Sequence, residues 1–271
     1  MDLSKKCASL DFGIPKSPNS VMDSIDTELA TRIRTDIING VYSEGERLSE
    51  AQLCETHNVS RTPVRLALRI LERQGIILRG EGRGYRIQSP TISDILQAVQ
   101  VRGHLESLAA RLMALSPEKP KHLPAMKQAI DTMDDLIALD CLDEPTIRRM
   151  QATNEVFHTS ILEACGNSYV GFTCGQISHL PMLAVGSMVF DRTVLETSEK
   201  LERGMFRLRL GNAQHQVIYD AIESGDAVRA AGVMSEHSHT MLEYIRTFEK
   251  RDSNLTVSDL VSYSAGEMLD L

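Results

Sequence analysis

The sequence predicts a mainly α-helical protein in two parts: a small N-terminal domain with one short sheet, and a larger all-α antiparallel helical bundle. Three observations lead to this fold class. Between residues 48 and 87, two short helical stretches are followed by a glycine-rich hairpin. Beyond residue 90, apolar residues recur at helical spacing and the pattern breaks at Pro or Gly. The balance of charge also changes between the two parts.

The charge is unevenly distributed along the chain. Residues 61–90 hold seven arginines against two glutamates, whereas residues 91–271 hold 16 basic and 25 acidic side chains. The net charge of −8 for the whole chain therefore hides a locally positive region. Positive charge gathered in one segment of an acidic protein indicates that this segment contacts a polyanion such as nucleic acid.

The composition favours a cytoplasmic protein. No stretch approaches the roughly eighteen apolar residues that cross a membrane, and residues 1–20 are polar and aperiodic, which predicts a disordered segment rather than a secretory signal. The five cysteines are scattered, odd in number and form no Cys-x-x-Cys pair. We therefore expect a reducing compartment, no disulfide framework and no membrane partner.

The first domain, residues 21–88, is expected to hold three helices. The first begins near Ser24 or Asp26 and ends near residue 39, and residues 41–47 form a turn. Ser49 and Gln52 have the spacing of a capping box, which places the start of a second helix that ends near residue 56. Ser60 is expected to cap the third helix, in which Pro63 falls in the first turn.

The third helix, residues 61–73, has two distinct faces. Arg61, Arg65, Arg69 and Arg73 line one face, opposite an apolar face that begins with Val64. Such a stripe is often no more than a solvated helix face. Here it follows a helix and a turn, and precedes strands at 76–78 and 85–87 around a glycine-rich basic tip. That order predicts an N-terminal winged helix-turn-helix, which binds DNA.

The first domain resembles the GntR family of bacterial transcription regulators. The motifs that carry the resemblance are G-E-R-L-S-E at 45–50, V-S-R-T-P-V-R at 59–65, A-L-R-I-L-E at 67–72 and G-R-G at 82–84. The resemblance implies contacts with phosphates and base edges by the third helix, and a wing that reaches the minor groove. The DNA-contacting residues that it implies are Arg47, Ser60, Arg61, Thr62, Pro63, Arg65, Arg69, Arg83 and Gly84. Ala51 stands where some relatives carry a phosphate-contacting Arg.

The second domain, residues 91–250, is expected to be a helical bundle, followed by a polar tail at 251–271 with one possible terminal helix. The helices are expected at 91–115, 121–141, 144–165, 167–190, 196–224 and 226–249. Four polar residues interrupt their apolar faces: Asn154, His158, His215 and His237. They are either separately satisfied core residues or members of one polar site. A shared site would suit a metal ion, because imidazole is the commonest ligand of divalent transition metals.

Arg102 also lies on an apolar helix face, among Ile95, Val99 and Met113. A buried guanidinium needs an anion. The residues leave two partners open: Glu106, one helical turn further on, or the carboxylate of a ligand that is bound fork-to-fork.

The second domain resembles the FCD effector domain of FadR-type GntR regulators, through V-R-x-x-L-E at 101–106, N-E-V-F-H at 154–158 and H-Q-V-I-Y-D-A-I-x-S-G-D at 215–226. The resemblance implies a metal ion, Zn or Ni, held by Asn154, His158, His215 and His237, and a small organic acid as effector, which Arg102 helps to hold. Asn154 replaces the usual Asp and Gln214 replaces the usual Glu. Both changes should weaken the affinity for a cation.

The resulting hypothesis is a homodimeric repressor that binds an inverted-repeat operator and responds to a small carboxylate, not an enzyme. Two alternatives remain. The metal ion itself could be the signal, or three histidines could hold a Zn ion that activates water in a hydrolase. No Glu or Asp is placed beside the histidines as a general base, so the hydrolase has less support.

Overall fold

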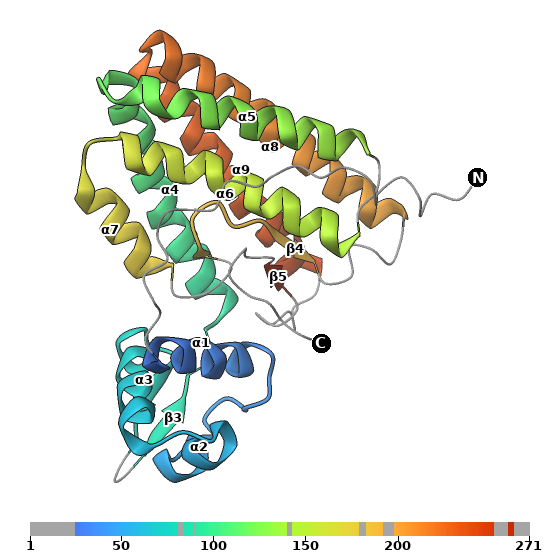
Figure 1. Ribbon diagram of the computed structural model, residues 1–271. Coiled ribbons are helices and arrows are strands. Elements are labelled where there is room, and N and C mark those ends of the chain that lie inside the picture. The colour runs from blue at the N-terminus through green and yellow to red at the C-terminus, as the bar shows by residue number, and fades with distance from the viewer. Residues whose placement is uncertain are drawn as a thin grey trace. The chain divides into compact units, whose positions relative to one another are not determined.

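The fold is mainly α-helical, as predicted. The computed structural model in Figure 1 describes residues 25–80, 84–88, 90–139, 143–178, 183–191, 198–251 and 260–262. The chain divides into two compact units, residues 1–91 and 92–271. The segment 1–20 that was expected to be disordered lies outside the described residues, as does half of the predicted wing tip, residues 81–83. No described helix is long and apolar enough to cross a membrane.

The first unit is a winged helix-turn-helix. Its elements are α1 (Ile25–Ile38), β1 (Arg47–Leu48), α2 (Glu50–His57), α3 (Arg61–Arg73), β2 (Ile77–Arg79) and β3 (Tyr85–Ile87). Helix α1 packs against α3, and the strands form an antiparallel sheet in the order β1-β3-β2, in which Arg47 lies opposite Arg86. Residues 41–47 were expected to be a turn only. Arg47 instead begins a strand, because the short β1 completes the edge of the wing sheet.

The two helix starts differ in their capping. The Ser49 hydroxyl accepts a hydrogen bond from the backbone N–H of Gln52 at 3.2 Å, as the capping box predicted. Ser60 occupies the N-cap of α3 in an extended conformation, but its side chain makes no capping hydrogen bond, contrary to expectation. The third residue of α3 is Pro63, which has no N–H to donate, so one of the two usual partners of a capping hydroxyl is missing.

The second unit is an antiparallel helical bundle with a small added sheet. Its elements are α4 (Ile92–Leu115), α5 (Lys119–Ala138), α6 (Glu144–Ala164), α7 (Ser168–Ile177), β4 (Val189–Asp191), α8 (Ser198–Ser224), α9 (Ala227–Arg251) and β5 (Leu260–Ser262). Helix α4 packs along α9, and α5 packs against both α6 and α8 (Figure 1).

One prediction for this unit was wrong, and the described part of the tail forms a strand. The helix expected at 167–190 ends at Ile177, and residues 189–191 form a strand instead. Gly186 has a φ of +66°, a left-handed conformation that an α-helix does not accommodate. In the tail, where one terminal helix was considered possible, residues 260–262 form a strand that pairs antiparallel with β4.

A polar layer separates two hydrophobic cores in the bundle. One core contains Phe157 of α6 and Ile218 of α8, and the other contains Met150 of α6 and Leu208 of α8. At the level where the two cores meet, the same two helices carry five buried polar residues: Gln151, Asn154, His158, Asn212 and His215. The apolar residues on either side therefore fix the position of the helices, and the polar layer is held between them.

The contact between α4 and α9 is unusually close at Gly103. A Cβ atom at this position would lie 2.7 Å from the Cβ of Ser238, so only glycine fits without a shift of the backbone. Because Ser238 is the neighbour of His237, this contact brings the part of α9 that contains His237 close to α4.

Candidate functional site

A basic hollow lies on the first unit, between the start of α3 and the wing sheet. Its volume is about 620 Å³. The residues that line it are Arg47, Ser49, Glu50, Ala51, Arg61, Arg65, Arg79, Gly84 and Tyr85. Four guanidinium groups thus face one carboxylate across a concave surface, which is a suitable electrostatic surface for a phosphate backbone.

One ion pair inside this hollow orients a predicted DNA-contacting residue. The Nε of Arg65 donates to Oε2 of Glu50 at 2.9 Å. This hydrogen bond joins α3 to the first turn of α2. The pair is solvent-exposed, with 59% of the Arg65 side chain accessible, so it orients the guanidinium without contributing much to stability.

The predicted DNA-contacting residues fall into three groups. Arg47, Arg61, Arg65 and Gly84 line the hollow. Ser60, Thr62 and Arg69 are exposed on or just before α3 but outside the lining, and Pro63 is half-buried in its first turn. Arg83 lies outside the described residues.

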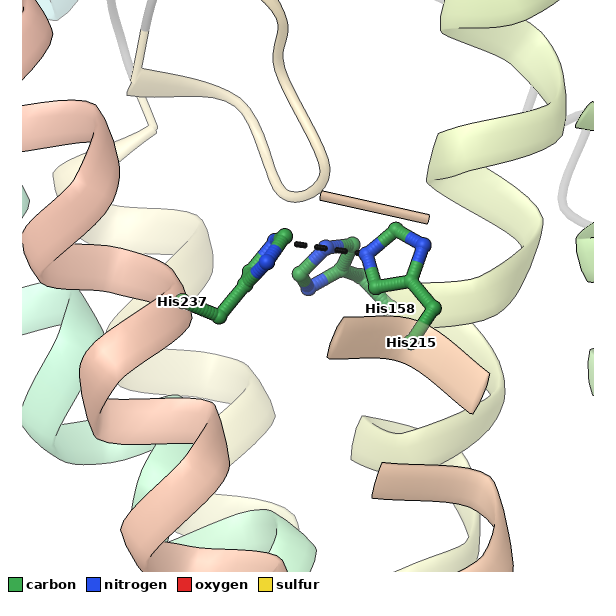
Figure 2. A group of neighbouring side chains, drawn as sticks. All are labelled: His158, His215 and His237. Atoms are coloured by element: carbon green, nitrogen blue, oxygen red, sulfur yellow. Dashed lines mark hydrogen bonds between the residues drawn. The ribbon is translucent and has the colours of Figure 1, made fainter. Parts of the chain in front are cut away.

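In the second unit, three histidines from three helices meet. His158 of α6, His215 of α8 and His237 of α9 turn their rings toward one another (Figure 2), and one nitrogen from each lies within 4.8 Å of the other two. The Nε2 atoms of His215 and His237 are 3.2 Å apart. Two nitrogens that bind one ion at about 2.0–2.1 Å are separated by about 3.3 Å in tetrahedral geometry, so this spacing suits a shared ion.

A hydrogen bond on the far side of the His237 ring determines which of its nitrogens is available to a ligand. The Nδ1 of His237 lies 3.0 Å from Oε1 of Gln214. An amide oxygen only accepts, so Nδ1 carries the proton and Nε2 keeps its lone pair. The Nδ1 of His158 lies 3.7 Å from Oε2 of the buried Glu106. Gln214, expected only to weaken a metal site, therefore orients one of the histidines.

The three imidazoles are held in the neutral form. Burial lowers the pKa of His158 and His215 well below the usual 6.5, and the charges of neighbouring groups add to the effect. Burial also lowers the pKa of His237 to about 4, assisted by the charges of Arg102 and Arg207. Neutral imidazole is the form that binds a metal ion, so no proton has to leave at neutral pH.

Asn154 connects the site to the chain segment between α7 and β4. Its Nδ2 donates to the carbonyl oxygen of Gly186 at 2.7 Å. Gln151 binds the same carbonyl at 2.9 Å and accepts from the backbone N–H of Met188 at 2.6 Å. We call residues 184–188 the strap. A Cβ at Gly186 would lie 2.8 Å from Cα of Glu155, so glycine allows the strap to lie directly on α6.

These residues fit a divalent transition-metal ion. Three neutral imidazoles supply the nitrogen ligands that Zn and Ni prefer, and Asn154 lines the same cavity as His215 and His237. Because the Asn154 amide nitrogen is directed to Gly186, its side-chain oxygen is the atom left to face the cavity. Such an ion would act there as a Lewis acid that attracts an oxygen ligand.

The cavity beside the histidines, which we call the histidine cavity, has a volume of about 70 Å³. Its lining residues are Met133, Asn154, Ser187, Met188, Arg207, Leu208, Gly211, Asn212, Gln214, His215, His237, Thr240 and Met241. Arg207 is the one cation among these described residues, and its guanidinium carbon lies 4.1 Å from the centre of the Tyr244 ring.

Each of the two units matches the model of a known protein family. Residues 26–87 match the model of the bacterial regulatory proteins of the gntR family, and residues 97–240 match the model of the FCD domain. The second match alone spans more than half of the chain. This protein belongs to the GntR family. Its first unit is the family's helix-turn-helix, its second is an FCD domain, and the members are transcription regulators rather than enzymes.

Individual relatives of this GntR regulator are distant. It is 23% identical over 225 residues to the HTH-type transcriptional repressor GlaR of Escherichia coli, covering 79% of this chain and 92% of GlaR. It is 28% identical over 139 residues to the HTH-type transcriptional regulator YdhC of Bacillus subtilis, covering 51% of this chain and 60% of YdhC. The solved structure of E. coli McbR/YncC has the same fold, with a TM-score of 0.56, 16% identity and coverage of 84% and 99%.

Arg102 of the GntR regulator is committed to internal contacts. Its Nη1 donates to the carbonyl oxygen of Ala184 at 2.7 Å and to the hydroxyl of Ser187 at 3.3 Å, and its Nε lies 3.5 Å from Glu106. Of the two partners that the sequence left open, the structure therefore provides Glu106. Arg102 is not among the described residues that line the histidine cavity.

Sequence reasoning missed Arg207, which lines the histidine cavity. A signal was present. Arg207 and Gln214 are seven residues apart on α8, so they share a helix face next to that of His215. The pattern did not stand out because arginine is common on exposed helix faces and α8 is predominantly polar.

Proposed function

We propose that this regulator binds an inverted-repeat operator as a homodimer, represses transcription there, and is controlled by a small organic acid in the histidine cavity. The observation that carries the proposal is a cluster of three neutral histidines in a family of transcription regulators, two of which, His215 and His237, line one cavity together with Arg207. Such a cavity suits a small anion, and a divalent ion at the histidines would be its Lewis-acid partner.

The basic hollow supports the DNA-binding part of the proposal. Arg61 and Arg65 are exposed at the start of α3, in the position from which a recognition helix contacts base edges. Arginine is the common bidentate reader of guanine, and the exposed hydroxyls of Ser60 and Thr62 suit phosphate oxygens. Because the Ser60 hydroxyl makes no capping hydrogen bond, it can donate a hydrogen bond to a DNA phosphate oxygen instead.

Exposed apolar residues on α4 and α7 support the homodimer. On α4, Val101, Leu108 and Leu115 recur every seven residues with 51%, 40% and 66% of their surface exposed. On the neighbouring α7, Tyr169 and Phe172 are 78% and 63% exposed. Large apolar side chains gathered on two adjacent helices are typical of a protein–protein interface, and a second copy of the chain would cover them.

A metal ion and an acid bound in the histidine cavity influence DNA binding through the strap. The strap contacts the site through Asn154 and Ser187, and Arg102 attaches the same strap to α4. A ligand that changes the strap therefore acts on α4, the first helix of the second unit. Coupling between ligand sites in regulators is typically about 1–3 kcal/mol, or roughly 5–150-fold in operator affinity.

The test is a binding assay with the full chain and DNA from upstream of its own gene. We expect specific binding at about 150 mM salt that changes at least fivefold when a small carboxylate is added to metal-loaded protein. The same titration with a neutral analogue, such as the matching amide, is the control. No specific binding under any of these conditions contradicts the proposal. A response to Zn or Ni without any acid favours the alternative in which the metal itself is the signal.

A further inference from the structure

The hydrogen bond between Arg65 and Glu50 determines which edge of the Arg65 guanidinium is available to DNA. Nε of Arg65 donates to Oε2 of Glu50 at 2.9 Å, and the two residues are 15 positions apart in the sequence. A guanidinium is a rigid plane with one N–H on Nε and four on its two Nη atoms. Because Glu50 binds the Nε edge, the two Nη atoms remain to bind two acceptors side by side. The O6 and N7 atoms of guanine are such a pair of acceptors.

Glu50 is the better held of the two groups. It is the first residue of α2, and the Ser49 hydroxyl caps the start of this helix. Leu53, one helical turn further on the same face, is fully buried, and α2 packs against α3. The Glu50 side chain is 36% exposed, whereas the longer Arg65 side chain is 59% exposed. The carboxylate therefore restricts the rotamers of Arg65 before DNA is present.

Glu50 also brings a negative charge to a surface that suits phosphates. It is the one acid among the described residues that line the basic hollow, where four arginines are present. A carboxylate close to the DNA backbone is unfavourable for every sequence alike, since phosphates repeat along the whole duplex. A residue that only strengthened DNA binding would be neutral or basic at this position. The effect of the carboxylate on Arg65 is the better explanation of its place in the hollow.

We propose that Glu50 is a positioning residue that secures the preference for one guanine in each operator half-site. It holds Arg65 by Nε so that both Nη groups are directed to O6 and N7 of that guanine, and its charge lowers the affinity for DNA of any sequence. This inference rests on the operator binding of the proposed function. It adds the base that Arg65 binds and the residue on which this recognition depends. Discrimination increases because the ordered Arg65 side chain loses less freedom when it binds the correct base.

Two substitutions at position 50 separate the hydrogen bond from the charge. Glu50→Ala removes both, whereas Glu50→Gln keeps an oxygen acceptor on a side chain of the same length and removes only the charge. Both variants should bind unrelated DNA about two- to threefold more tightly than the wild type. In Glu50→Ala, the ratio of operator affinity to unrelated-DNA affinity should fall about tenfold or more, as expected for one lost bidentate contact with a base. In Glu50→Gln, this ratio should stay within about threefold of the wild type.

The experiment uses the full chain and two fluorescent duplexes of equal length, one from upstream of its own gene and one unrelated, at about 150 mM salt. Each guanine of the operator duplex is then replaced in turn by 7-deazaguanine, which lacks the N7 acceptor but still pairs with cytosine. The guanine that Arg65 binds is the one to which Arg65→Ala no longer responds. Its replacement should weaken operator binding about fivefold or more in the wild type and in Glu50→Gln. In Glu50→Ala, the same replacement should change the affinity by less than about twofold.

Glu55→Gln is the matched control, because it removes the same charge from an exposed position on α2 outside the basic hollow. It should bind both duplexes as the wild type does. The thermal unfolding of every variant should change little, since the ion pair of Glu50 and Arg65 is solvent-exposed. Wild-type sensitivity of Glu50→Ala at the Arg65 guanine, or a wild-type affinity ratio in this variant, overturns the proposal. An equal loss in Glu50→Gln and Glu50→Ala also overturns it, because the hydrogen bond to Nε would then not be the cause.

The same measurements distinguish this inference from the proposed function. If the wild type prefers the operator and Glu50→Ala keeps that preference, operator binding stands and the role of Glu50 is wrong. If Glu50→Ala loses the preference but no small carboxylate changes the operator affinity of the wild type, the role of Glu50 stands and the proposed control by an acid is wrong. A wild-type protein without any preference overturns both.

Discussion

The side-chain amide of Asn154 donates to the carbonyl oxygen of Gly186 at 2.7 Å, and this bond holds the strap against α6. The contact requires both residues. Asn154 offers an N–H that an aspartate lacks, and Gly186 combines a φ of +66° with the absence of a Cβ. This contact between α6 and the strap is therefore specified by one amide and one glycine, and each can be tested separately.

Gly186→Ala should displace the strap. The added Cβ would lie 2.8 Å from Cα of Glu155, and a left-handed φ is strained for alanine. We expect the metal-free protein to lose about 1–3 kcal/mol of stability, and its affinity for Ni²⁺ to fall because Asn154 loses its partner. Calorimetric unfolding and Ni²⁺ titration measure the two effects. Gly171→Ala is the control, since a Cβ there meets no atom within 4 Å and alanine favours the helix.

The stability of the metal-free protein should fall as the pH is lowered from about 6.5 to about 4. Burial lowers the pKa of His237 to about 4 and lowers those of His158 and His215 as well, whereas histidines in the unfolded chain titrate near 6.5. The unfolded state therefore binds protons first as the pH falls, and each such histidine contributes up to about 1.4 kcal/mol per pH unit.

Urea unfolding in the presence of a chelator measures this slope. In His237→Asn, the change of unfolding free energy with pH should decrease by the contribution of one histidine. In His239→Asn, a change at an exposed position on the same helix, it should stay as in the wild type. Equal slopes in wild type and His237→Asn would mean that His237 is not held neutral by its surroundings.

Arg102→Met should be strongly destabilising, in a pH-dependent way. The change leaves Glu106 buried without its cation, which typically costs about 3–5 kcal/mol. Burial already raises the pKa of Glu106 above its usual 4.5, and the charge of Arg102 opposes that rise. A carboxyl whose folded-state pKa is raised loses stability as the pH increases above 4.5, so the difference between variant and wild type should be larger at pH 8 than at pH 5.

The double variant Arg102→Met with Glu106→Gln checks the cause. Removing the carboxylate as well should restore part of the stability and abolish the extra loss at pH 8. A deficit that is the same at both pH values, and unchanged in the double variant, would instead place the effect in the contact between Arg102 and Ala184.

Local sequence signals were sufficient for most of the fold. The capping pair Ser49 and Gln52 fixed the start of α2, and the apolar periodicity with Pro and Gly breaks placed five of the six bundle helices within a few residues. These signals act between neighbours in the chain. The pairing of β4 with β5 joins segments that are far apart in the sequence, so no local signal specifies it. Each strand has only three residues, which is too few to show an alternating pattern.

The same distinction, between signals from neighbouring residues and contacts between distant segments, applies to the residues of the site. His158, His215 and His237 could be selected because each interrupts an apolar helix face, and the structure brings them together. Arg207 could not, because its position depends on how α8 and α9 pack around Tyr244. The partners of Arg102 were also hidden, since the carbonyl of Ala184 belongs to the strap, whose backbone position no side-chain pattern specifies.

Arg61→Ala and Arg65→Ala should each abolish the preference for operator over unrelated DNA while leaving the fold intact. Both residues are exposed in the basic hollow, so their removal costs base contacts rather than core packing. Competition binding against unrelated DNA gives the specificity ratio. Arg73→Ala removes the same charge from an exposed position at the end of α3, outside the hollow, and should retain the preference. Loss of the preference in all three would indicate a non-specific effect of charge.

Phe172→Glu should convert the proposed dimer to a monomer. Phe172 is 63% exposed on α7, and a carboxylate in the centre of an apolar interface would be buried without a partner. Analytical ultracentrifugation measures the assembly, and Val228→Glu, 80% exposed at the start of α9, is the control. A monomer binds one half-site at a time, so its operator affinity should fall by about 100-fold or more through lost avidity, while each winged domain keeps its preference for a half-site. A Phe172→Glu protein that remains dimeric would place the interface on a different face of the bundle.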